Sequence, residues 1–185
     1  MVKIICEGNS DKNKLKEILS FLNIIYTDDN FIVMGNKSNI FKYESDEYKT
    51  LIQLVKFKKV EKVLFVVDAD YEKDNAKYGG YKKTENELKS LITALKIEHV
   101  SDFYITCNPI SNDGYLESLL LSTVDDTLKN CYDDFLDCIK FKEKNHHKYI
   151  MEQLHKLTKP NKPYDLKHRN FEKLIDKLDS LFNEA

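Results

Sequence analysis

The feature that most constrains the fold is an uninterrupted apolar run, Val63–Val67, near the middle of the chain. Five residues are too few for a core helix, and they suit a strand buried on both faces, as the inner strands of a parallel sheet are. Val2–Cys6 is a similar, mostly apolar run at the start of the chain, and Phe103–Cys107 is a third. A protein with several such strands must cover both faces of its sheet with other elements.

Amphipathic segments alternate with these runs. Apolar residues recur at helical spacing within Asp11–Asn23, Tyr48–Val55 and Leu88–Leu95, and a further strand is expected within Ile24–Met34. Alternating strands and helices predict an α/β fold, because parallel strands need crossover helices and the crossovers are right-handed. We therefore expect a Rossmann-like, mostly parallel sheet of about four strands with helices on both faces.

The last third of the chain has a different pattern. Strand signals stop after Thr123, and helical periodicity returns in Leu128–Phe141, Tyr149–Leu157 and Phe171–Phe182. Thr158–Tyr164, which contains two prolines, is the one linker-like stretch. We expect an α/β domain over residues 1–122 and a helical extension over residues 123–185 that packs on it.

Composition and charge exclude several classes of protein. The 185 residues have a net charge of −2, so any contact with nucleic acid must come from a local patch or through metal ions. The four cysteines are far apart and form no C-x-x-C pair, which excludes a zinc ribbon. No signal peptide and no apolar stretch of about 18 residues is present. We expect a cytoplasmic protein that does not associate with membranes.

Carboxylates directly follow the first two buried runs. Glu7 comes after the first run, and Asp68 and Asp70 come after the second. Ligands of open α/β sheets bind at the carboxyl ends of the strands, so these three side chains are expected at one edge. Carboxylate oxygens suit Mg²⁺ or Mn²⁺. Asp68 and Asp70 alternate along the backbone, so both reach the same place only if the chain turns between them.

Each of these carboxylates also has a purely structural interpretation. A D-x-D pair is common in surface loops, where one aspartate caps a helix or faces solvent, and any strand must end in something polar. Gly8, directly after Glu7, favours a site, because glycine permits a tight turn and a close approach of metal or phosphate.

A helix start follows the first strand. Asn9 or Ser10 can cap this helix, and Asp11 in its first turn suits the positive end of the helix dipole. The free N–H groups at a helix N-terminus bind anions, so Gly8, Asn9 and Ser10 are candidates for binding phosphate. A site that attracts both a divalent cation and a phosphate is what phosphoryl-transfer chemistry requires.

These motifs resemble a known fold. The pattern of an apolar strand, Glu7-Gly8-x-x-Asp11, a helix, and later an apolar strand followed by Asp68-x-Asp70 is similar to the Toprim domain. This domain is the catalytic core of topoisomerases, DnaG-type primases, recombination proteins and overcoming-lysogenization-defect nucleases. The resemblance covers about residues 1–122. It implies that Glu7, Asp68 and Asp70 bind Mg²⁺ and act on phosphodiester bonds, with Asp11 as an additional or outer ligand.

A third element follows the last expected strand. The segment Gly114-Tyr115-Leu116-Glu117 resembles the G-x-L-E segment of small stand-alone Toprim-like proteins of uncharacterised function near the nuclease branch. On this resemblance Glu117 adds a carboxylate to the same edge. The alternative for Glu117 is a solvated position on a helix whose other face is apolar.

The chain also departs from the family pattern. Tyr71-Glu72-Lys73 follows the D-x-D where a glycine often comes soon, and no Walker A sequence is present. The ATPase half of the overcoming-lysogenization-defect proteins is therefore missing, and a partner chain could supply it. The loop that follows contains Lys82 and Lys83 with nearby tyrosines, which could hold a phosphate backbone and stack a base. Its alternative is a charged surface loop.

Two functions remain open at this point. The first is a Mg²⁺-dependent, nuclease-like enzyme that acts on nucleic acid. The second is a non-catalytic Toprim-like protein that uses the acidic edge for a partner or a regulatory nucleotide. A haloacid-dehalogenase phosphatase is disfavoured, since that chemistry needs its nucleophilic Asp at the first strand and Thr or Val where Glu72 stands. His146, His147 and Lys148 could bind metal or phosphate, but adjacent histidines at a helix start are commonly just exposed.

Overall fold

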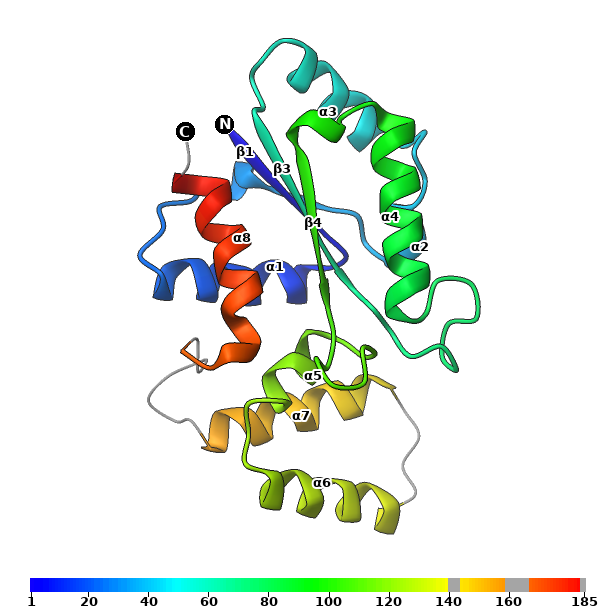
Figure 1. Ribbon diagram of the computed structural model, residues 1–185, viewed down its shortest axis with the longest axis vertical. Coiled ribbons are helices and arrows are strands. Elements are labelled where there is room, and N and C mark those ends of the chain that lie inside the picture. Colours follow the sequence, from blue (N-terminus) through cyan, green and yellow to red (C-terminus); the bar gives the residue numbers. More distant parts are fainter. Residues whose placement is uncertain (140–143, 159–166, 184–185) are drawn as a thin grey trace.

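The computed structural model of the protein describes residues 1–139, 144–158 and 167–183. A four-stranded sheet forms the centre of the molecule (Figure 1). The spatial order is β2-β1-β3-β4, and every neighbouring pair is parallel. The strands are β1 (Val2–Cys6), β2 (Phe31–Val33), β3 (Lys62–Asp68) and β4 (Ser101–Thr106). This confirms the expected α/β class and the parallel sheet.

Helices connect and follow the strands. In chain order they are α1 (Asn9–Phe21), α2 (Lys37–Ile40), α3 (Asp46–Lys56), α4 (Tyr81–Leu95), α5 (Leu116–Leu121), α6 (Asp126–Ile139), α7 (Lys144–Thr158) and α8 (Glu172–Asn183). Short 3₁₀ turns precede β2, β4 and α8. After β4, the described residues contain helices and no further strand.

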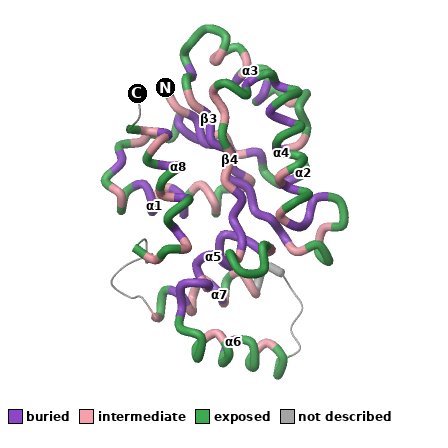
Figure 2. The backbone as a smooth tube through the Cα atoms, viewed as in Figure 1, coloured by how far each residue is buried: buried purple, intermediate pink, exposed green. Residues whose placement is uncertain are grey.

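The two faces of the sheet have separate cores, because side chains alternate along each strand. Phe65 and Val67 of β3 pack with α2, α3 and α4, while Leu64 and Val66 pack with α1, α5 and α8. The central strands are buried along nearly their whole length (Figure 2). The apolar run of β3 therefore is buried on both faces, as its sequence predicts.

Helix α8 covers the sheet directly, although it lies in the segment expected as a C-terminal extension. Phe171, Leu174 and Leu178 are completely buried, in the same core as Ile4 and Leu64. Figure 1 shows α8 and α1 on the same side of the sheet. The C-terminal helix thus completes one face of the α/β unit, and the boundary between residues 122 and 123 stays a prediction.

One local expectation is confirmed and one is corrected. The strand expected within Ile24–Met34 is Phe31–Val33, and the side chain of Asn30 donates to Val2 O and accepts from Thr27 N, which holds the turn before it. Helix α4 begins at Tyr81, so Lys82 and Lys83 are helical.

Other expectations fall at the limits of the described residues. The predicted helix end at Phe141 and most of the predicted linker Thr158–Tyr164 lie outside them. Within the described ranges, no helix combines the length and the apolar character that crossing a membrane requires.

The packing of α8 against the sheet predicts how a substitution in this helix changes the free energy of unfolding. Leu178→Ala should lower the free energy of unfolding by about 3 kcal/mol, because it leaves a cavity in a fully packed core. Leu157 is 78% exposed, and Leu157→Ala is the matched control, with an expected change within about 0.5 kcal/mol. Urea denaturation measures both. Equal stability of the two variants would show that α8 does not contribute to the core.

Candidate functional site

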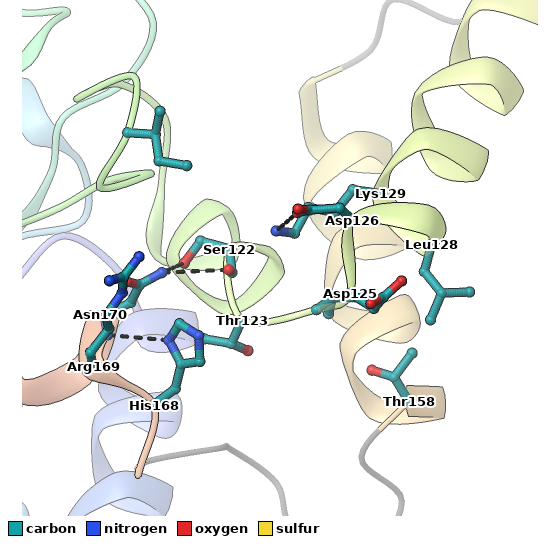
Figure 3. Close-up of a pocket in the computed structure, with 12 residues that line it drawn as sticks. Ser122, Thr123, Asp125, Asp126, Leu128, Lys129, Thr158, His168, Arg169 and Asn170 are labelled. Atoms are coloured by element: carbon teal, nitrogen blue, oxygen red, sulfur yellow. Dashed lines mark hydrogen bonds and ion pairs between the residues drawn. The ribbon is translucent and has the colours of Figure 1, made fainter.

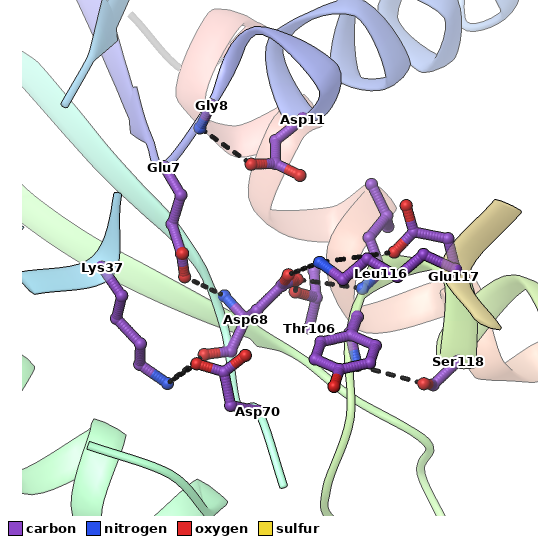
Figure 4. Close-up of polar contacts among 12 residues, drawn as sticks. Glu7, Gly8, Asp11, Lys37, Asp68, Asp70, Thr106, Leu116, Glu117 and Ser118 are labelled. Carbon is purple, nitrogen blue, oxygen red and sulfur yellow. Dashed lines mark hydrogen bonds and ion pairs between the residues drawn. The ribbon is translucent and has the colours of Figure 1, made fainter. Parts of the chain in front are cut away.

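Asp68 lies at the end of β3, and its polar contacts connect it to several other elements at the carboxyl edge of the sheet (Figure 4). Its Oδ1 accepts hydrogen bonds from Thr106 Oγ1 at 2.6 Å and from Leu116 N at 2.9 Å. Its Oδ2 pairs with Lys148 Nζ at 2.9 Å. Burial alone would raise the pKa of the Asp68 carboxyl, but Lys148 and the hydrogen bond from Thr106 outweigh it and hold that pKa below its ordinary value. Asp68 is therefore an ionised, buried carboxylate.

Glu7 reaches Asp68 from the neighbouring strand. Cys6 pairs with Val66 in the β1–β3 register, so the two strands end side by side, and Glu7 Oε1 accepts from Asp68 N at 3.1 Å. Burial, followed by the charges of Asp68 and Asp70, raises the pKa of Glu7 to about 8. The structure therefore brings the Glu7 carboxylate against the backbone of Asp68 at the ends of two neighbouring strands.

Asp70 is held on the other side of the D-x-D turn. Its φ of 60° turns the chain, and its backbone pairs with Gly114. Lys37 is 4% exposed and fixes this turn, since its Nζ donates to Asp68 O at 2.6 Å and to Ala69 O at 2.8 Å and lies 3.3 Å from Asp70 Oδ2. Burial lowers the pKa of Lys37, and Asp70 and Glu7 partly offset this effect. Gly114 has φ of 94°, and a Cβ there would collide with the Ser118 side chain.

Asp11 and Gly8 form the start of α1. Gly8 is the N-cap, and its N–H donates to Asp11 Oδ2 at 2.9 Å. Neither Asn9 nor Ser10 is the cap; both are exposed residues of the first turn. Gly8 has an ordinary extended backbone with φ of −134°, so the predicted need for glycine at a tight turn is wrong. Burial, followed by the charge of Asp68, raises the pKa of Asp11 to about 6.

Glu117, in the first turn of α5, is buried rather than solvated, with 3% exposure. Lys14 from α1 forms a hydrogen-bonded ion pair with Glu117 Oε1, and Lys148 lies 3.8 Å from Oε2. Oε2 itself is buried without a hydrogen bond. Lys148 also lies 4.1 Å from the centre of the Tyr115 ring. The Asp68 and Glu117 charges outweigh the effect of burial and raise the pKa of Lys148.

Four of the predicted carboxylates line one hollow of about 400 Å³, which we call the acidic hollow. They are Glu7, Asp11, Asp68 and Glu117, and Gly8, Ser10 and Lys148 line it as well. Asp70 does not line it, because its carboxylate is directed at Lys37. The structure thus brings four of the five candidate ligands to one hollow.

Ion pairs link most of the carboxylates at this edge to lysines of the described residues. Lys14 pairs with Glu117 and lies near Glu152, Lys37 pairs with Asp70, and Lys148 pairs with Asp68. Glu7 and Asp11 instead accept hydrogen bonds from backbone N–H groups. No three His, Cys, Asp or Glu side chains of the described ranges are arranged to hold a metal ion.

The predicted phosphate-binding lysines lie elsewhere. Lys82 lines a separate hollow with Tyr71 and Tyr81, and Lys83 lies 4.0 Å from Glu72. Neither lines the acidic hollow. Lysines that do contact the cluster, Lys14 and Lys37, were not singled out from the sequence, because nothing in their local pattern distinguishes them in a lysine-rich chain.

A larger hollow, of about 660 Å³, lies beside the end of α5 (Figure 3). Asn170 donates to Ser122 there, and His168 Nδ1 accepts from Asn170 N. None of the predicted carboxylates lines this hollow. The acidic hollow is the better functional candidate despite its smaller volume, since it has buried charges at the carboxyl edge of a parallel sheet.

Comparisons with protein-family models, with curated proteins and with solved structures find no match to this chain.

The raised pKa values predict how stability depends on pH. Between about pH 4.5 and 8 the folded protein retains protons on Glu7 and Asp11 that the unfolded chain releases, so the free energy of unfolding should fall as pH rises through this window. Glu7→Gln keeps an acceptor for Asp68 N and removes the buried charge. It should flatten the decline, with a gain on the order of 2 kcal/mol at pH 8 relative to wild type.

Urea denaturation at pH 5, 6.5 and 8 in EDTA measures this effect. Glu47, which is exposed on α3, supplies the control variant Glu47→Gln, which should follow wild type. The same slope in wild type and in Glu7→Gln would contradict a proton held by Glu7.

Proposed function

We propose that this chain is a Toprim-like enzyme that cleaves phosphodiester bonds of nucleic acid with Mg²⁺ or Mn²⁺. The observation that carries the proposal is the acidic hollow, in which Glu7 and Asp68 from adjacent parallel strands meet Glu117 and the N-terminus of α1. Buried carboxylates next to free helix N–H groups attract a cation and a phosphate to the same place.

The composition of the cluster supports a divalent cation. All its acidic ligand atoms are carboxylate oxygens, the donors that Mg²⁺ and Mn²⁺ prefer. Glu117 Oε2 is a buried acceptor without a hydrogen bond among the described residues. In the proposal Glu7, Asp68 and Asp70 are the main ligands, and Asp11 and Glu117 are additional ones. Binding requires the Lys148 ammonium to move aside from Asp68 and the Asp70 carboxylate to turn away from Lys37.

The bound ion would acidify a water molecule and stabilise charge on the reacting phosphate. The chain's own groups would position that phosphate. The N–H groups of Asn9 and Ser10 in the first turn of α1 have no partner within the helix and can donate to phosphate oxygens. Lys148, released from Asp68, can pair with the same phosphate, while Lys37 keeps the backbone of the D-x-D turn fixed.

The proposal includes partners and location. With a net charge of −2, nucleic acid would be held by local groups and the metal ion. Because the sequence lacks a Walker A motif, an ATPase would be a separate chain. A cytoplasmic location fits such a substrate.

A second candidate function is favoured by one specific observation. Lys148 pairs with Asp68 and Lys37 with Asp70, so two ammonium groups lie where a metal ion would be expected to bind. If these ion pairs persist in solution, the acidic edge is a non-catalytic binding site for a protein or a regulatory nucleotide. The experiments that follow separate the two functions.

Metal binding is the first test. Wild type should bind Mg²⁺ by isothermal titration calorimetry, and Asp68→Asn should weaken binding at least about tenfold, because it removes charge but keeps an oxygen acceptor for Thr106 and Leu116 N. Asp176→Asn, on the exposed face of α8, is the matched control and should bind as wild type does.

Equal Mg²⁺ affinity in wild type and Asp68→Asn would refute the metal site. Cleavage assays with Mg²⁺ or Mn²⁺ on single- and double-stranded DNA and RNA then test the reaction. Metal binding without cleavage of any of these substrates would favour the non-catalytic function.

Lys148 gives a sharper prediction, because it would both compete with the metal and bind the substrate. Lys148→Met should tighten Mg²⁺ binding about tenfold, since one competing cation is lost, yet lower the cleavage rate. Lys156→Met, about two turns further along α7, removes a lysine that pairs with Glu152 and should change neither quantity as much. Unchanged Mg²⁺ affinity in Lys148→Met would show that the lysine does not compete for the site.

A further inference from the structure

Another hollow, of about 570 Å³, lies between the end of α2 and the loop that follows the D-x-D turn. We call it the aromatic hollow; it is lined chiefly by Phe41, Lys42, Tyr43, Lys77 and Tyr78. We propose that it stacks the bases of a single-stranded nucleic acid next to the acidic hollow. This inference rests on the proposed function and adds the class of substrate.

The hollow has two packed aromatic rings, Phe41 and Tyr78, and one exposed ring, Tyr43. The Phe41 and Tyr78 rings lie 4.8 Å apart, centre to centre, at 40°. Tyr78 is 8% exposed, and its backbone is held by hydrogen bonds from its N to Asn75 Oδ1 and from Thr84 Oγ1 to its O. Tyr43, in contrast, is 55% exposed. The exposed Tyr43 ring, next to the fixed pair of rings, offers a π-surface on which a base can stack.

Positive charge lies directly beside these rings. Lys77 Nζ is 4.7 Å from the centre of the Tyr78 ring, and Lys42 donates to the neutral amide oxygen of Asn39. Both lysines are exposed, and neither forms a salt bridge with a carboxylate of the described ranges. Glu44 is the one acidic residue in the lining. Aromatic faces interleaved with free ammonium groups are typical of surfaces that track a single-stranded backbone.

The same two segments build both hollows. Gly35 and Asn36, just before α2, line the acidic hollow, whereas the residues just after α2 line the aromatic hollow. Helix α2 has four residues, so it spans about 6 Å. Lys37 at its start bonds to the backbone of the D-x-D turn, and the loop from that turn leads to Lys77 and Tyr78. Residues at the two ends of this short helix thus contribute to the two hollows, and a strand that runs along α2 from the acidic hollow would bring its bases to the aromatic hollow.

Stacking selects single strands over duplexes. The bases of a duplex are already stacked on each other, whereas those of a single strand have free faces. The arrangement also predicts little dependence on base sequence, because every base has a π-face.

The test compares oligonucleotides that differ only in their bases. Fluorescence anisotropy in EDTA at low salt measures binding of a labelled 12-nucleotide single strand, an abasic strand of the same length and charge, and the corresponding duplex. Wild type should bind the single strand at least about fivefold more tightly than the other two. Tyr43→Ala should remove this preference, Tyr43→Phe should retain it, and Lys77→Ala should weaken binding of all three probes.

Matched controls lie at the opposite edge of the sheet. Phe57, 66% exposed, and Lys59, also exposed, follow the end of α3. Phe57→Ala and Lys59→Ala should bind every probe as wild type does. Equal binding of the intact and abasic strands by wild type, or an unchanged preference in Tyr43→Ala, would overturn the proposal. A preference for the duplex would overturn it as well.

The test separates this proposal from the proposed function. Because binding is measured in EDTA, loss of the stacking preference together with normal Mg²⁺ binding would refute the aromatic hollow alone. A stacking preference in wild type, together with absent Mg²⁺ binding, would refute the metal site and leave the aromatic hollow supported.

Discussion

The buried carboxylate of Asp68 is the interaction on which the carboxyl edge of this fold depends. Its two oxygens accept from β4 through Thr106, from the start of α5 through Leu116 N, and from α7 through Lys148, while its backbone N–H donates to Glu7 just after β1. One residue therefore joins the ends of two neighbouring strands and two later helices. Loss of its charge would leave the half-buried Lys148 without its nearest partner, which is more costly than loss of a surface pair.

Around Asp68, positive charge is supplied by helices rather than by the strands. Lys14 comes from α1, Lys37 from α2 and Lys148 from α7, and each contacts a different carboxylate of the cluster or its turn. These ion pairs fix helices from distant parts of the sequence onto one sheet edge. Glu7 is not part of these ion pairs, and burial, followed by the charges of Asp68 and Asp70, raises its pKa to about 8.

The strand pattern predicted the part of the site that depends on the backbone. Val63–Val67 favoured an inner parallel strand, and parallel strands end at one edge, so Glu7 and Asp68 were expected at the same edge. That they are neighbours follows from the strand order, in which β1 lies next to β3. The contacts of Lys148 and Lys37 could not be predicted in this way, because long side chains meet their partners only after helices have packed. The sequence predicted that the C-terminal helices pack on the α/β domain but not which face α8 covers, because amphipathic periodicity shows that a helix has an apolar face without identifying the surface that this face meets.

The cost of the cluster is itself an argument for function. Burying Glu7 beside Asp68 and Asp70 destabilises the ionised fold, and an amide at this position would accept the same hydrogen bond without the repulsion. A purely structural edge therefore has no need for a carboxylate here. Groups with pKa values shifted by burial and by like charge are concentrated where chemistry or ligand binding uses them. Because Lys148 holds Asp68 from α7, a helix outside the sheet's own crossovers, entry of a cation or a phosphate would act on α7 as well, and ligand binding would be coupled to the packing of the C-terminal helices.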